Sequence, residues 1–259
     1  MSNLEVNMNS RERRHFLLQE LQKAKAVYVR ELAQRLAVSD MTIRRDLHRL
    51  ADMNIVTLVH GGAVLNEGTA ALANVSARSL RMTKEKNAIA EFCAGLIKEG
   101  NAIYLDTGST NIEIAEELKN RQNIAVLSHS LPIHNILSAN DKLQLIAMPG
   151  FYRSSPHGFF GDLTCRMIKN FRIDIAFLGI SSIDASGIMS PDFDDQAVKL
   201  ALLERANKKV VVFDHTKINH LSFIQVCNLK DINMLVTDKQ ADKDFLTAAQ
   251  KQGVEIVQV

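Results

Sequence analysis

Residues Ser39 to Leu50 read Ser-Asp-Met-Thr-Ile-Arg-Arg-Asp-Leu-His-Arg-Leu. Ser39 is a favoured N-cap residue, and Ile43, Leu47 and Leu50 recur at the spacing of one buried stripe on an α-helix. An arginine side chain can bind O6 and N7 of guanine together and also binds phosphate well. This stretch therefore predicts a helix that reads the major groove of DNA. Its outward side chains are Asp40, Met41, Thr42, Arg44, Arg45, His48 and Arg49.

Two further helices are expected before this segment. Apolar side chains recur at helical spacing in residues 11–24, which are also basic, and in the shorter stretch 29–37. Ala33 is small enough for a close helix crossing, and Val38 fills the tight turn before Ser39. The order of helix, turn and recognition helix is that of a helix-turn-helix unit. The expected inward positions are Phe16, Leu17, Leu21, Leu32 and Leu36.

A β-hairpin is expected directly after this unit. Residues 55–59 and 63–65 are short apolar runs on either side of His60-Gly61-Gly62, a composition typical of a tight turn. Such a hairpin would form a wing with His60 at its turn, so residues 1–66 predict a winged helix-turn-helix domain. The candidate DNA contacts are Ser39, Met41, Thr42, Arg44, Arg45, His48, Arg49 and His60.

Charge distinguishes this interpretation from a plainer one, in which residues 39–50 form a solvated helix of a small bundle. Residues 11–52 hold ten Lys or Arg and six Asp or Glu, an excess of four, whereas the whole chain carries a formal net charge of +2. Positive charge is concentrated where DNA would bind, which favours a nucleic-acid interface. A scaffold protein that has the fold without reading DNA is a further alternative, and the outward Arg44 and Arg45 speak against it.

Length and composition leave room for a second, larger domain. The chain has 259 residues, 46% of them apolar, and a winged helix needs only about a quarter of that length. No apolar run is long enough to cross a bilayer, and no export signal opens the sequence, so a cytoplasmic protein is expected. The three cysteines are odd in number and far apart, and no histidines have metal-ligand spacing. We therefore expect no disulfide, metal or cofactor.

The remainder of the chain predicts an α/β domain over residues 84–259, joined to the first domain by a linker at residues 67–83. From Lys84 an amphipathic helix is expected, with Gly100 just past its end. Strands and helices then alternate, which indicates a mostly parallel sheet covered on both faces. The expected strands are residues 102–105, 124–127, 143–148, 175–178, 210–213, 234–236 and 255–257.

Several polar loops follow these strands, and ligands of such sheets bind beyond the carboxyl ends of the strands. In Asp106-Thr107-Gly108-Ser109-Thr110, three hydroxyls, a glycine and the start of a helix near Asn111 could hold a phosphate. Arg153 and Lys217, in other loops, could neutralise a phosphomonoester. Each feature also has a plain explanation, because Ser109 or Thr110 could be a helix N-cap and the two cations could be solvated.

These motifs resemble those of the DeoR family of bacterial transcriptional regulators. The resemblance implies a C-terminal domain similar to sugar-phosphate isomerases that binds a phosphorylated sugar or related metabolite, and it implies a repressor of a carbohydrate-metabolism operon. The motifs that carry it are residues 38–47 with Leu50, residues 60–63, 106–110, 150–153, Gly161, residues 174–179, Gly187 and residues 214–217. The effector contacts carried over from the resemblance are Lys217 and the loop of Asp106, Thr107, Gly108, Ser109 and Thr110. Arg153, as a cation, and Ser128, in the loop after a neighbouring strand, complete the predicted contacts.

The chain departs from the common family pattern beside this pocket. Ser128-His129-Ser130 stands where many members have Thr-Asn-Ser, and Pro149-Gly150 stands where many have Gly-Gly. Pro149 lacks a backbone N–H that a ligand contact could need. His129 is expected to pack against its neighbours more than to bind a ligand or sense pH. The part of the pocket that binds phosphate would then match the family pattern, whereas the part that binds the sugar would differ from it.

The competing hypothesis is an active sugar-phosphate isomerase with an attached DNA-binding module. Such an enzyme needs a base near the carbon proton and an acid near the carbonyl oxygen. No spacing singles out a catalytic pair, so we expect no catalytic residues. One recognition helix covers too few base pairs of double-stranded operator DNA, so a dimer or tetramer that reads repeated half-sites is expected. The carboxylates considered are Asp174, Asp184, Asp192, Asp194 and Asp195.

Overall fold

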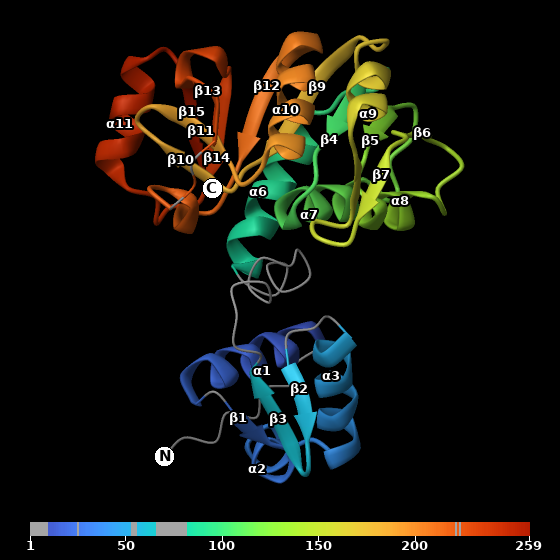
Figure 1. Cartoon of the computed structure of the whole chain (residues 1–259), viewed down its shortest axis with the longest axis vertical. Coiled ribbons are helices and arrows are strands. Elements are labelled where there is room, and N and C mark those ends of the chain that lie inside the picture. The colour runs from blue at the N-terminus through green and yellow to red at the C-terminus, as the bar shows by residue number, and fades with distance from the viewer. Residues whose placement is uncertain (1–9, 25, 53–55, 66–81, 221, 223) are drawn as a thin grey trace. The chain divides into compact units, whose positions relative to one another are not determined.

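The computed structural model describes residues 10–24, 26–52, 56–65, 82–220, 222 and 224–259, and it divides the chain into two compact units, residues 1–81 and 82–259 (Figure 1). Of the expected linker at residues 67–83, only the last two residues are among those described. Among the helices in these described ranges, none combines the length and the apolar character needed to cross a membrane.

The N-terminal unit is a winged helix-turn-helix, as the sequence predicts. Its three strands form one antiparallel sheet in the order β1-β3-β2, so the expected hairpin of β2 and β3 is present. Strand β1 was not expected, because it forms by pairing with β3, which is distant in the sequence: Tyr28 lies opposite Gly62. Helix α2 is shorter than predicted, since Ala37 adopts a positive φ of 52° in the turn. The elements are α1 (Ser10–Ala24), β1 (Ala26–Tyr28), α2 (Val29–Arg35), α3 (Asp40–Asp52), β2 (Val56–Val59) and β3 (Gly62–Leu65).

The C-terminal unit is built on a parallel seven-stranded sheet in the order β15-β14-β12-β9-β4-β5-β6. All seven strands expected from the sequence are present, with ends that differ by a few residues. They are β4 (Ala102–Leu105), β5 (Ala125–Ser128), β6 (Gln144–Ala147), β9 (Ile173–Gly179), β12 (Ala206–Val212), β14 (Met234–Thr237) and β15 (Glu255–Gln258).

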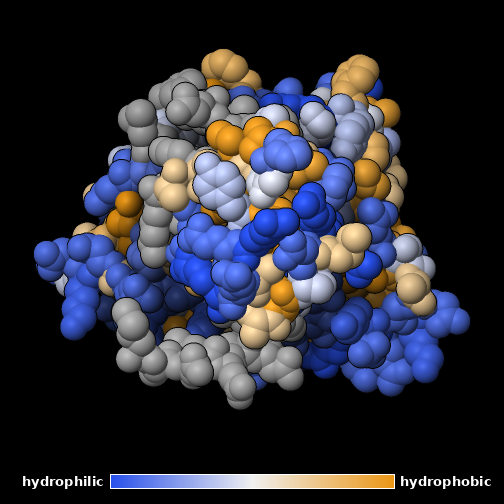
Figure 2. Space-filling model, turned by 90° about the horizontal axis from the view of Figure 1, so that it is seen from below, coloured by the Kyte–Doolittle hydropathy of each residue, from blue (hydrophilic) through white to orange (hydrophobic). Residues whose placement is uncertain are grey.

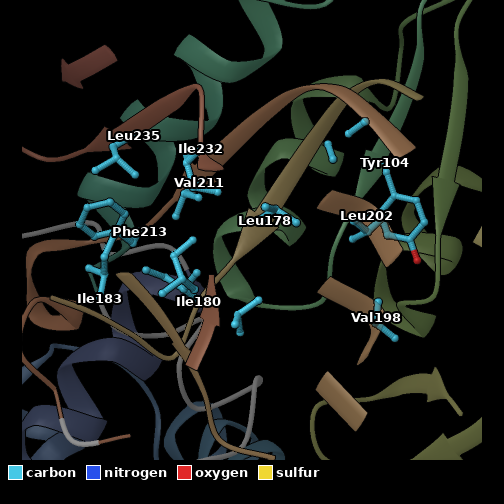
Figure 3. Packing of buried hydrophobic residues seen from close by; sticks show 14 of the residues in the cluster. Tyr104, Leu178, Ile180, Ile183, Val198, Leu202, Val211, Phe213, Ile232 and Leu235 are labelled. Carbon is cyan, nitrogen blue, oxygen red and sulfur yellow. The ribbon is translucent and has the colours of Figure 1, made fainter. Parts of the chain in front are cut away.

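Helices cover both faces of this sheet, because successive strand residues point to opposite faces. Ile103 and Leu105 pack on one face with apolar residues of α6, α7 and α8, whereas Tyr104 packs on the other with residues of α10 and α11. Figure 3 shows the second face, where Tyr104 and Leu178 of the sheet lie near Leu202 of α10. The helices are α6 (Thr83–Gly95), α7 (Ser109–Leu118), α8 (Leu131–Leu137), α9 (Asp162–Ile168), α10 (Phe193–Arg205) and α11 (Lys243–Lys251).

Two small antiparallel sheets and two 3-10 helices complete the unit, and the sequence did not predict these strands. Each of their strands has three or four residues and includes a polar residue or a glycine, so none forms a continuous apolar run like most of those in the main sheet. Gly100 corrects a second expectation: α6 ends at Gly95, and Gly100 lies further on, in a turn with φ of 82°. The additional elements are β7 (Phe151–Arg153), β8 (Gly158–Phe160), β10 (Ser182–Asp184), β11 (Gly187–Ser190), β13 (Ile224–Cys227), η1 (His215–Lys217) and η2 (Leu229–Asp231).

Candidate DNA interface and effector site

Helix α3 presents the polar face that the sequence predicts. The hydroxyl of Ser39 accepts the backbone N–H of Thr42 at 3.2 Å and so caps the start of the helix. Ile43, Leu47 and Leu50 are buried in the core of the unit. Figure 2 shows strongly hydrophilic residues, with hydrophobic ones between them, on the face seen from below. Met41, Arg44, Arg45, His48, Arg49 and, at the turn of the wing, His60 are exposed, and Thr42 is partly exposed.

A buried ion pair fixes α3 against α1, and the sequence analysis missed it. Asp46 is 2% exposed, although the other charged residues of α3 from Arg44 to Arg49 face solvent. Its two carboxylate oxygens contact the guanidinium groups of Arg13 and Arg14 on α1. A carboxylate buried without such partners would be costly, so these contacts hold the two helices in one arrangement. Two of the basic residues of the unit therefore have a structural role and are not part of the α3 surface.

The Asp106 loop lies where the strand order of the large sheet reverses. From β4 the chain continues to β5 and β6 on one side, and it then returns to β9 on the other side of β4. Ligands of open parallel sheets bind at this kind of reversal. Asp106 follows β4 and Gly179 ends β9; the Gly179 N–H donates to Asp106 Oδ2 at 3.1 Å. An added Cβ at Gly179 would lie 2.4 Å from the carbonyl oxygen of Thr107, so only glycine permits this close approach.

A buried lysine lies between two carboxylates below this loop. Lys199 Nζ on α10 is 3.0 Å from Asp106 Oδ2 and 2.6 Å from Asp195 Oδ1. Burial raises the pKa of Asp106 to about 6, and the Lys199 ammonium opposes that rise. Burial also disfavours the charge of Lys199, but the attraction of both carboxylates outweighs it and raises the lysine pKa. Lys199 was not among the site residues predicted from sequence; its i,i+4 spacing from Asp195 was the available signal.

His129 packs inside the protein, as the sequence analysis expected. It is fully buried, and its Nδ1 is 2.9 Å from the hydroxyl of Tyr104. Burial and the nearby Lys199 charge lower the pKa of His129 to about 3, so the ring is neutral at physiological pH. Its Nε2 lies 3.6 Å from Asp106 Oδ1, which is too long for a hydrogen bond.

The start of α7 combines several groups suited to an anion. The helix begins at Ser109, two residues earlier than expected, and its N-cap is Gly108 with no side-chain cap. Neither Ser109 nor Thr110 is therefore the N-cap that the plain explanation supposed. Gly108 has a φ of 120°, and an added Cβ there would meet no atom within 4 Å. Asn111 is fully buried, and neither of its side-chain amide atoms has a hydrogen-bond partner among the described residues.

Arg153 lies at the rim of the site and is already engaged. Its Nη1 and Nη2 each donate to a carboxylate oxygen of Asp192 at 2.9 Å, and Nη1 also lies 3.3 Å from Asp194. The hydrogen bond to Asp192 raises the pKa of Arg153 despite partial burial. The guanidinium lies over the ring of Phe160, 5.2 Å from its centroid. An anion that bound Arg153 would thus compete with these two aspartates.

Ser128 supports the loop after β5, whereas Lys217 lies on η1, further along the same edge of the sheet. The Ser128 hydroxyl is fully buried, donates to the carbonyl of Leu105 at 2.8 Å and accepts the N–H of Ser130 at 3.0 Å, so it shapes its loop. Lys217 lies on η1 beyond β12, and β9 separates β12 from β4 in the sheet. It shares the carboxyl edge with the Asp106 loop but belongs to a strand two positions away.

The carboxylates considered for catalysis have other roles here. Asp192 and Asp194 bind Arg153, Asp195 binds Lys199, and Asp174 accepts the N–H of Ala102 at 2.8 Å at the start of β4. Asp184 accepts two hydrogen bonds from Ser186 in a turn. Over the described part of the chain, no group of three or more His, Cys, Asp or Glu side chains is arranged to hold a metal ion.

Comparison with known proteins finds two family profiles along the chain. The family described as "DeoR C terminal sensor domain" matches residues 81–239, and the "DeoR-like helix-turn-helix domain" matches residues 13–69. The two matches follow one another, and the first covers more than half of the chain.

Among the proteins that this chain resembles over nearly their full lengths are transcriptional repressors. The "Glycerol-3-phosphate regulon repressor" of Escherichia coli K12 is 29% identical over 89% of this chain and 92% of its own. The "HTH-type transcriptional repressor GlcR" of Bacillus subtilis is 26% identical over 96% of both chains. Among solved structures, ribose 5-phosphate isomerase A from Methanocaldococcus jannaschii has a TM-score of 0.38 and 21% identity, over 51% of this chain and 53% of that one.

Proposed function

We propose that this chain, which belongs to the DeoR family, represses a carbohydrate-metabolism operon and that a phosphorylated sugar controls its affinity for DNA. As a member of that family it is a DNA-binding transcriptional regulator with a C-terminal sensor domain and not an enzyme. The observation that carries the proposal is the Asp106 loop, which lies at the strand reversal of the sensor domain beside the uncapped start of α7.

The exposed face of α3 reads the operator in this proposal. Arg44 and Arg45 contact base edges or phosphates in the major groove, and His60 contacts DNA from the wing. Ser39 positions the helix by capping it. The remaining proposed contacts are Met41, Thr42, His48 and Arg49.

The effector phosphate binds at the start of α7, where free N–H groups and the hydroxyls of Thr107, Ser109 and Thr110 meet. Gly108 leaves open space for it, and Asp106, already bonded to Lys199, holds the loop in shape. Asn111 adds an amide that has no other partner among the described residues. Lys217 supplies positive charge from the same edge, and Ser128 supports the neighbouring loop.

Arg153 provides the switch. A phosphate that draws its guanidinium away from Asp192 and Asp194 would change the contact between β7 and the start of α10. Effector affinity would then differ between two arrangements of the protein, which is the condition for control of DNA binding. Family resemblance makes release from DNA the expected result.

The proposal assigns residues 1–66 to DNA binding, 67–83 to a linker, and 84–259 to sensing and self-association. A dimer or tetramer presents recognition helices to repeated half-sites of double-stranded DNA. The protein would act in the cytoplasm, where bacterial operator DNA is found.

DNA reading is tested by selecting a binding site from random duplex DNA with the full-length protein. We expect a site with repeated half-sites. Arg44→Ala and Arg45→Ala should each cost about 1–3 kcal/mol, with relaxed preference at one base. Arg172→Ala, which removes an exposed arginine of the C-terminal unit, is the matched control. Unchanged affinity and sequence preference in both α3 variants would refute the role of these arginines.

Effector control is tested with glycerol 3-phosphate, ribose 5-phosphate and glucose 6-phosphate, each beside its unphosphorylated counterpart and inorganic phosphate. A ligand at about 100 times its Kd stabilises the folded protein by about 2.7 kcal/mol, so it should raise the melting temperature by several degrees. The same compound should weaken operator binding, and Asn111→Leu should abolish both effects. A DNA affinity that none of the phosphates alters would overturn the proposed control.

A further inference from the structure

A patch of apolar side chains is exposed on the C-terminal unit. In the described part of that unit, every large apolar side chain that is exposed belongs to β7, α9 or α10. The most exposed are Phe151 at 82% and Phe193 at 74%. We define the patch by its five apolar members, which are Phe151, Tyr152, Leu163, Phe193 and Leu200.

The elements that carry these side chains are neighbours in the structure, because β7 pairs with β8, and β8, α9 and α10 contact one another. The ring of Phe151 lies against Gly161, directly before α9, at 3.2 Å from where a Cβ would stand. Arg153 of β7 binds Asp192, directly before Phe193. Lys169, directly after α9, binds Glu204 near the end of α10 at 2.9 Å, so the C-terminal ends of these two helices lie close together.

We propose that this patch is a self-association face, which binds the same patch of a second copy of the chain. The five side chains expose on the order of 500 Å² per copy, judged from the size of aromatic residues. A standard interface buries about 800 Å² per partner, so the patch supplies most of the apolar area that a dimer needs. A monomer rarely exposes large aromatic side chains in one cluster.

The charges around the patch favour a second copy over other occupants. Among the described residues, the cations of β7 and of α9 with the residue after it are Arg153, Arg166 and Lys169, and each binds a carboxylate. These residues therefore give the patch no excess of positive charge that would attract DNA or an acidic membrane. Asp162 and Arg166 lie one turn apart on α9 and bind each other at 2.9 Å, and both are more than two-thirds exposed. In a two-fold dimer with α9 antiparallel to its mate, Arg166 of one copy lies opposite Asp162 of the other.

This inference extends the proposed function, because repeated half-sites require paired DNA-binding units. It also places the effector switch at the edge of the dimer contact, since Arg153 binds the aspartates on either side of Phe193. An effector that displaced these aspartates would act directly on the self-association face.

The test is sedimentation of the full chain without DNA or effector, so its outcome does not depend on whether a sugar phosphate binds. Phe193→Glu and Phe151→Glu should each raise the dissociation constant at least about 30-fold, as loss of a central contact does. Both positions are exposed, and an unchanged far-UV circular dichroism spectrum checks that the variants fold. The matched controls are Phe193→Leu, which keeps an apolar side chain, and Gln250→Glu, which adds a charge to the exposed surface of α11; both should associate as the wild type does.

Charge reversal supplies a second, independent test. Arg166→Asp should weaken association, and the double variant Asp162→Arg with Arg166→Asp should restore it. A reduction from tetramer to dimer by Phe193→Glu also supports the assignment. A wild-type chain that remains monomeric, or glutamate variants that associate as the wild type does, would overturn it.

Discussion

Replacement of Lys199 by methionine tests the buried charge cluster of the sensor domain. The change removes the ammonium that lies 3.0 Å from Asp106 and 2.6 Å from Asp195, and it leaves two carboxylates buried without their cation. Loss of one partner from a buried ion pair costs about 3–5 kcal/mol. For a unit of this size, 1 kcal/mol shifts the melting temperature by about 2–4 °C. We therefore expect Lys199→Met to melt roughly 6–20 °C lower than the wild type at pH 8.

The loss should depend on pH in a defined direction. Burial raises the pKa of Asp106 from 3.8 to about 6, so its contribution to stability is fully present below pH 3.8 and is lost as the pH rises through 6. Without Lys199 that pKa rises further, and Asp106 stays protonated to higher pH. A protonated carboxyl group does not need the cation. The difference between variant and wild type should therefore be smaller at pH 5 than at pH 8.

Calorimetry of the full chain at both pH values measures this effect. Lys208→Met is the matched control, because Lys208 is partly exposed and lies 3.8 Å from the exposed Glu255. It should change stability by less than about 0.5 kcal/mol at either pH. A Lys199→Met protein that melts within 2 °C of the wild type at pH 8, or with the same deficit at both pH values, would refute the reasoning.

Three further substitutions probe single contacts. Ser39→Ala removes the cap of α3 and should cost the N-terminal unit about 1 kcal/mol in urea unfolding, whereas Ser39→Asp should not; equal losses would contradict the capping role. Gly62→Ala places a Cβ 2.0 Å from the carbonyl oxygen of Val27 and should lower both operator affinity and the stability of the wing. Gly95→Ala is the control: its added Cβ meets no atom within 4 Å, so operator affinity and stability should not change. Ser128→Ala leaves a buried carbonyl and N–H unpaired and should lower sensor stability by about 1–3 kcal/mol, and an unchanged denaturation midpoint would argue against this role.

Most helices and the strands of the large sheet were predictable because each shows a local pattern in the sequence, either an apolar stripe at helical spacing or an apolar run. The stripe of Ile43, Leu47 and Leu50 and the apolar runs of the large sheet are repeated local patterns, and all of them correspond to observed elements. Strands β1, β7 and β10 were not predicted. Strand β1 depends on a partner distant in the sequence, since Tyr28 lies opposite Gly62 of β3. Strands β7 and β10 belong to short hairpins and contain polar residues, so neither forms a continuous apolar run.

The candidate site was predictable only in part, for a related reason. The Asp106 loop follows a recognisable strand, so its position could be predicted. Lys199 lies 93 residues further along, and its contact with Asp106 depends on how α10 packs on the sheet. Asp46 was equally hidden, since a carboxylate on a polar helix gives no sign of burial until Arg13 and Arg14 are placed beside it. Pairings of this kind follow from tertiary packing and not from spacing.

The strand order of the large sheet sets the sequence of events during synthesis. Its central pair, β4 and β9, joins Ile103 to Ile175, whereas the N-terminal unit completes its own sheet by Leu65. Domains fold as units as they leave the ribosome, the N-terminal one first. A nascent chain is therefore expected to carry a folded DNA-binding unit well before the strands of the sensor domain have been translated.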